Sequence, residues 1–200
     1  MPPFRALAAI AIAALLAAAV LSGCGAPAPA SFDPAQPCTQ DYQGAGAYPE
    51  LEAIVPPSWD GQPAGELNSG RTCQPGSLGS LLDHGIHELR FAGATWRFAD
   101  GVGMTIAVFE GEGLDTARIM EFYRKGAKEA GRTDQSSQTD ITVGTTPALR
   151  FDATDPDGKR LLVVTWATAT EGRVHVLLGA GLDDELVADI LAKLGQRAGG

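Results

Sequence analysis

Two segments of the chain, 114–130 and 182–194, repeat apolar residues at spacings of three and four, which is the pattern of a helix with one apolar face. Asp115 or Thr116 can cap the amino end of the first helix, and Gly131 ends it. The two apolar faces consist of Ile119, Phe122, Tyr123, Ala127 and Ala130, and of Leu186, Val187, Ile190, Leu191 and Leu194. Such helices gain most of their stability by packing this face on another apolar surface, so both are expected to lie on a sheet.

Stretches rich in aromatic and β-branched residues can form that sheet. Strands are expected at 88–98, at 102–110, at 140–143 continuing after a gap to 148–153, at 160–167 and at 173–180, with a weak extended stretch at 62–67 and short helices at 49–54 and 75–82. Tight turns, of which Asp155-Pro156-Asp157-Gly158 is one, join successive strands, and strands joined in this way pair antiparallel. The sequence therefore predicts an α+β domain, a mainly antiparallel sheet of about five to six strands flanked by helices.

The first residues of the chain have the composition of an export signal. Arg5 is their only charge, and every residue from Ala6 to Leu21 is Ala, Ile, Leu or Val, a run that is short for a membrane-spanning helix. The run ends at Leu21-Ser22-Gly23-Cys24, which resembles the lipobox of bacterial lipoproteins. The resemblance implies cleavage before Cys24, a diacylglyceryl thioether on its sulfur, and a new amino terminus that can be acylated, for example with palmitate. The alternative is an ordinary secretory signal followed by an unrelated cysteine.

Domain boundaries follow from this beginning and from the composition. Residues 1–23 are expected to be the signal peptide, and residues 24–48, rich in Pro, Ala and Gly, a solvated tether that carries the lipid anchor. Residues 49–196 are expected to form a single α+β domain and residues 197–200 a frayed tail. The expected location is the extracytoplasmic face of a cell membrane, held by the lipid on Cys24.

Charge and cysteine content restrict the possible partners. Without residues 1–23 the chain has 14 Lys and Arg against 24 Asp and Glu, because Arg5 is the only charged residue removed. This acidic balance argues against binding to nucleic acid and against broad adhesion to anionic headgroups. Cys38 and Cys73 are the two remaining cysteines besides Cys24, and outside the cytoplasm they are expected to form a disulfide. A metal pair or a reactive thiol is the alternative.

The order of elements over residues 85–195 is similar to that of the PsbP/Mog1-like fold, in which helices flank a central antiparallel sheet. Some cell-envelope lipoproteins of high-GC bacteria belong to that group. The resemblance implies an envelope location and a binding or assembly role, and it includes no signature motif.

Motifs with specific chemistry are not found, so the sequence predicts no catalytic residue, cofactor or metal. His84 and His87 have the spacing of a metal pair on a helix, but Gly85 is expected to end the helix between them. An EF-hand aligned on Gly158 would place Ala153 at a ligand position. Gly111-Glu112-Gly113 lacks the third glycine of a dinucleotide fingerprint, and no Gly-x-Ser-x-Gly elbow occurs.

Trp96 and Trp166 each lie in an expected strand and could line a hydrophobic pocket between sheet and helix. Ordinary core packing would also explain them. The hypothesis from the sequence is a non-catalytic binding module for an apolar ligand or for an envelope protein. The alternative is an extracytoplasmic hydrolase acting on cell-wall or lipid material.

Overall fold

A computed structural model describes residues 32–131, 135–154 and 157–198. The expected signal peptide and Cys24 lie outside the described residues. One compact unit begins at Phe32. It contains the strands, the two hydrophobic cores and the disulfide that are described below. None of the helices in these ranges combines the length and the apolar composition that a membrane-spanning helix requires.

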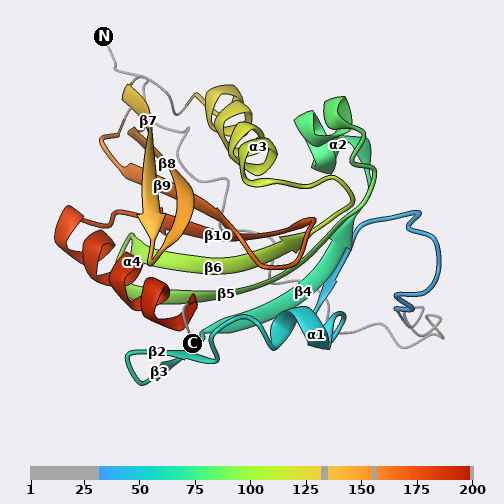
Figure 1. The fold of residues 1–200 in the computed structure, drawn as a ribbon, viewed down its shortest axis with the longest axis horizontal. Coiled ribbons are helices and arrows are strands. Elements are labelled where there is room, and N and C mark those ends of the chain that lie inside the picture. Colours follow the sequence, from blue (N-terminus) through green and yellow to red (C-terminus); the bar gives the residue numbers. More distant parts are fainter. Residues whose placement is uncertain (1–31, 132–134, 155–156, 199–200) are drawn as a thin grey trace, which may run out of the picture. The chain divides into compact units, whose positions relative to one another are not determined.

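The centre of the fold is an eight-stranded sheet in which every neighbouring pair is antiparallel (Figure 1). In spatial order its strands are β1 Tyr42–Gly44, β4 Glu66–Thr72, β5 Leu89–Ala99, β6 Val102–Glu110, β10 Arg173–Ala180, β9 Arg160–Ala167, β8 Thr146–Thr154 and β7 Gln135–Val143. A separate small hairpin pairs β2 Ser58–Trp59 with β3 Gln62–Pro63. The predicted α+β class with a mainly antiparallel sheet is confirmed.

The predicted number of strands, about five to six, is wrong because the main sheet has eight. Residues 140–143 and 148–153 were expected to form one interrupted strand, but they belong to two strands, β7 and β8, joined at Gly144 in a left-handed conformation. β7 lies at the edge of the sheet with its first six residues exposed, so its sequence carries no apolar alternation. β4 is also missed, since its buried residues include Ser69 and Arg71.

Helices cover both faces of the sheet (Figure 1). They are α1 Pro49–Glu52, α2 Pro75–Leu78, the 3-10 helix η1 Gly79–His84, α3 Thr116–Glu129 and α4 Asp184–Ala198. α3 and η1 pack on one face, and α1 and α4 pack on the other. Asp115 caps α3, because its carboxylate accepts a hydrogen bond from the Arg118 amide at 2.8 Å. Arg197, expected in a frayed tail, lies in α4.

Two hydrophobic cores result, one on each face of the sheet. On β9, Leu162, Val164 and Trp166 enter the core under α1 and α4, whereas Val163 enters the core under α3. Alternate residues of a strand point to opposite faces, so a strand covered on both sides is apolar throughout. This explains the continuous apolar run from Leu161 to Val164.

Residues 32–48, which we call the strap, are packed against the domain. β1 pairs with β4 so closely that a Cβ on Gly70 would lie 2.1 Å from the Tyr42 carbonyl oxygen. Tyr48 is 2% exposed, and Phe32 stacks on Tyr42 with ring centroids 4.1 Å apart. Most of residues 33–46 are exposed, as in a solvated tether, but the segment is attached to the domain through β1 and through the buried Ala47 and Tyr48, so the domain begins before residue 49.

The predicted disulfide between Cys38 and Cys73 is present and joins the strap to the segment after β4, with the two Cα atoms 6.1 Å apart. Closing a loop of 35 residues in sequence stabilises a fold by about 3–4 kcal/mol in the chain-entropy model. The disulfide thus fixes the point at which the chain enters the domain.

Candidate ligand-binding groove

An apolar groove of about 280 Å³ lies between the carboxyl-terminal half of α3 and strands β8, β9 and β10. The amino-terminal half of α3 packs on the sheet through Ile119 and Met120, which are fully buried in the core beneath it. After Phe122 and Tyr123, the residues of α3 that line the groove are small, namely Gly126, Ala127 and Ala130, and they leave space above the sheet. The walls of the groove are Phe122, Tyr123, Gly126, Ala127 and Ala130 from α3, and Phe151, Leu161, Leu162, Val163, Leu178 and Gly179 from the strands.

The groove continues into a second hollow of about 420 Å³ at the β5–β6 hairpin, because Leu161, Leu178 and Gly179 line both. The second hollow extends past Thr95 and Thr105 to the hairpin turn. Small-molecule sites typically have volumes of about 300–1,000 Å³ and mostly apolar walls. The combined space is therefore large enough for a chain-like apolar molecule.

Tyr123 is the titratable residue in the wall of the groove. Burial raises the pKa of its phenol, so the hydroxyl stays protonated at physiological pH. Its ring packs edge-on against Phe122 at 5.4 Å and against Phe109 at 6.5 Å. Within the described part of the chain no residue forms a hydrogen bond with the Tyr123 hydroxyl, which leaves a donor for a polar atom of a ligand.

Basic side chains stand on the opposite flank of α3, around a hollow of about 560 Å³ between this helix and strands β7 and β8. Arg124, Lys125 and Lys128 line it together with Ser136, Gln138 and Glu121, whose carboxylate pairs with Lys125 at 3.0 Å. Phe151, which is 4% exposed, lines both this hollow and the apolar groove, so the two lie on either side of this buried side chain. The flank thus places cations beside an apolar floor.

Trp96 and Trp166 are buried in the core under α1 and α4, on the sheet face opposite to α3, at 2% and 3% exposure. Trp96 donates its indole N–H to the Gln62 carbonyl at 3.3 Å and lies 6.4 Å from Trp59. It also borders the hollow at the β5–β6 hairpin. Trp166 borders a different hollow of about 310 Å³ near the end of α4. The structure does not bring the two tryptophans to one site.

His175 stacks on Trp166 in that hollow, with ring centroids 5.1 Å apart and the planes within 18° of parallel. Burial and, to a smaller extent, the positive charge of Arg173 together lower the pKa of His175 to about 4. The imidazole is therefore neutral at physiological pH. A neutral, half-buried histidine stacked on a tryptophan behaves as part of the core.

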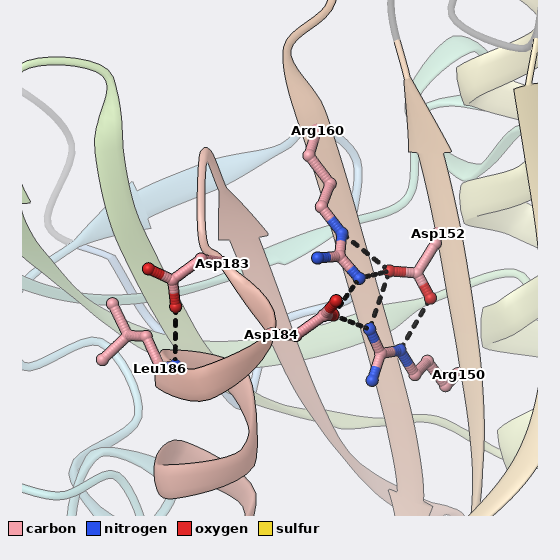
Figure 2. Close-up of polar contacts among 6 residues, drawn as sticks. All are labelled: Arg150, Asp152, Arg160, Asp183, Asp184 and Leu186. Carbon is pink, nitrogen blue, oxygen red and sulfur yellow. Dashed lines mark hydrogen bonds and ion pairs between the residues drawn. The ribbon is translucent and has the colours of Figure 1, made fainter.

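The densest charged cluster joins the amino end of α4 to strands β8 and β9 (Figure 2). Asp152 accepts from Arg150 Nε at 2.6 Å and from Arg160 Nη2 at 2.7 Å, and Asp184 pairs with Arg160 at 2.7 Å. Burial alone would raise the pKa of Asp152, but hydrogen bonds from the two arginines hold it below its usual value. The carboxylate is saturated by protein donors, so the cluster is a structural clamp rather than a binding site.

Metal ligands and catalytic groups are not gathered elsewhere in the ranges that the structure describes. No group of three or more His, Cys, Asp or Glu side chains in these ranges could hold a metal ion. His84 contacts Glu121 at 2.9 Å across the η1–α3 contact, and Gly85 between the two histidines is left-handed, as expected of a residue that ends a helix. His87 is exposed.

The groove under α3 was missed because its lining residues were counted only as an apolar helix face. The available signal was their size, since Gly126, Ala127 and Ala130 are too small to fill the distance between a helix and a sheet. Comparison with known proteins adds no further assignment: no protein-family model, curated protein or solved structure gives a significant match to this chain.

Proposed function

We propose that this protein is a non-catalytic, extracytoplasmic lipoprotein that is anchored through Cys24 and binds an apolar ligand in the groove under α3. The observation that supports binding most directly is the groove itself, whose walls are almost entirely apolar. The lipobox-like sequence before Cys24 supports the anchor. An anchored domain would hold its groove within reach of membrane lipids and their metabolites.

The groove is suited to a chain-like molecule because half-buried apolar side chains line it. Phe122, Leu161 and Leu178 are each partly exposed along its length. Each methylene that leaves water for such a surface contributes about 0.8 kcal/mol, so several methylenes of an acyl or alkyl chain would offset the entropy lost on binding. Tyr123 offers a hydrogen bond at the wall, which would fix the depth at which a polar atom of the ligand sits.

Gly126 allows a direct test of the groove. It lies in α3, lines the groove, and has open space where a side chain would begin. Gly126→Phe would place a ring in the groove without meeting the protein at its Cβ. Gly126→Ala is the matched control, because it also replaces glycine by a better helix former but leaves most of the space free.

The experiment is isothermal titration of residues 32–200 with dodecyl maltoside below its micelle concentration. We expect measurable binding by the wild type and by Gly126→Ala, and at least a tenfold loss of affinity in Gly126→Phe. Absence of binding by the folded wild type, or equal affinity in Gly126→Phe, would contradict the proposal and would favour an envelope-protein partner instead.

A further inference from the structure

We infer that the ligand of this groove is a single-chain anionic amphiphile, with its apolar chain in the groove and its negatively charged head group beside Arg124 and Lys128. The inference rests on the proposed function and specifies its ligand. The two hollows that flank α3 differ in chemistry, one apolar and one rich in basic side chains, and they are neighbours that share Phe151 as a lining residue.

The distribution of charge favours an anion at this place. The whole chain has a formal net charge of −9, yet α3 carries Arg118, Arg124, Lys125 and Lys128 against only Glu121 and Glu129. An acidic protein repels anions in general, so an anion is expected to bind where cations are locally in excess.

Two of these cations are available to a ligand. Lys125 is held by Glu121 at 3.0 Å and by Asp83 at 3.2 Å. Arg124 donates to the Gln138 side-chain oxygen at 3.1 Å, a neutral partner, and neither Arg124 nor Lys128 pairs with a carboxylate among the residues of known placement. Their charges are therefore not neutralised by the described protein.

Neighbouring polar groups fit the same kind of ligand. Ser136 and Gln138 face the basic hollow from the edge strand β7 and can donate hydrogen bonds to the oxygens of a phosphate or carboxylate. Leu149 and Phe151 form an apolar floor that continues toward the groove. A molecule with one charged end and one apolar end matches this arrangement, whereas a wholly apolar ligand would leave the cations unused.

The expected size of the head-group effect follows from exposure. Both cations are exposed, so their ion pairs with a head group are weak, and the two together should change an affinity by about tenfold at low salt. Screening should reduce the effect strongly at 0.5 M NaCl, where the Debye length is well below 8 Å.

The test compares probes that share a dodecyl chain. Residues 32–200 are titrated with dodecyl phosphate, dodecylphosphocholine and dodecyltrimethylammonium, each below its micelle concentration, at low salt. We expect dodecyl phosphate to bind about tenfold more tightly than dodecylphosphocholine, and the cationic probe to bind most weakly. Arg124→Gln combined with Lys128→Gln should abolish this preference for the phosphate probe.

The matched control is Lys193→Gln combined with Arg197→Gln, which removes the same two types of charge from α4 on the opposite face of the sheet. It should retain the preference for the phosphate probe. Equal affinities for the three probes in the wild type, or a preference that survives in the α3 variant or disappears in the α4 variant, would overturn the inference. If the dodecyl probes bind equally and Gly126→Phe blocks them, only the head-group inference fails; if none binds, the proposed function fails too.

Discussion

Acidification provides a sharp test of the structure around His175. The unfolded chain binds a proton on this residue below about pH 6.5, whereas burial and Arg173 lower the pKa in the folded protein to about 4. Between these values the unfolded state binds more protons, so stability is fully present above pH 6.5 and is lost as the pH falls to 4. A tenfold change in proton affinity corresponds to about 1.4 kcal/mol, and the expected loss is therefore about 3 kcal/mol.

The assay is urea unfolding followed by circular dichroism at pH values from 4 to 7. His175→Phe keeps a ring against Trp166 and removes the titrating group, so its free energy of unfolding should vary by less than about 1 kcal/mol between pH 5 and 7. The exposed His87→Gln is the matched control and should keep the wild-type slope. Carboxylates with a lowered pKa, such as Asp41 at about 2, begin to lose their contribution near pH 5 and lose most of it below pH 4, so the slopes are compared between pH 5 and 7. An unchanged slope in His175→Phe would refute the reasoning.

Three further predictions concern stability. Gly126→Ala should raise the melting temperature by about 1–4 °C, because alanine is about 0.5–1 kcal/mol better in a helix and its Cβ has open space; a lower melting temperature in calorimetry would contradict this. Asp152→Asn should lower the free energy of urea unfolding by about 1–3 kcal/mol, because Arg150 and Arg160 then lose the carboxylate between them and keep only the exposed Asp184; no change would show that the clamp is dispensable. Replacing Cys38 and Cys73 with serine should lower the free energy of unfolding by about 2–4 kcal/mol. A urea midpoint equal to that of the wild type would argue against a stabilising role of the disulfide.

The sequence was sufficient for elements whose apolar pattern reflects their surroundings. α3 and α4 are amphipathic because each has a sheet on one side and water on the other, so spacing alone located them. β7 has water over most of its length and β4 buries Ser69 and Arg71, so neither shows the alternation by which strands are recognised. The strap was missed for a related reason, since its contacts depend on a few aromatic residues in a segment rich in Pro and Gly.

The groove could not be predicted from the same pattern. A helix face composed of Gly126, Ala127 and Ala130 appears apolar, and only the distance to the facing strands shows that these residues leave space. The tryptophans attracted attention by their size, but period-two alternation does not specify which face of a sheet each helix covers. Trp166 therefore lies under α4, in a core distinct from the groove.

Native mass spectrometry of residues 32–200 tests the central claim most directly, after export to a bacterial periplasm and purification without detergent. Our account expects an adduct with the mass of one single-chain amphiphile, lost on denaturation, in the wild type and in Gly126→Ala but not in Gly126→Phe. A wild-type protein that carries no adduct and gains none from added dodecyl phosphate, or an adduct that persists in Gly126→Phe, would contradict ligand binding in the groove under α3.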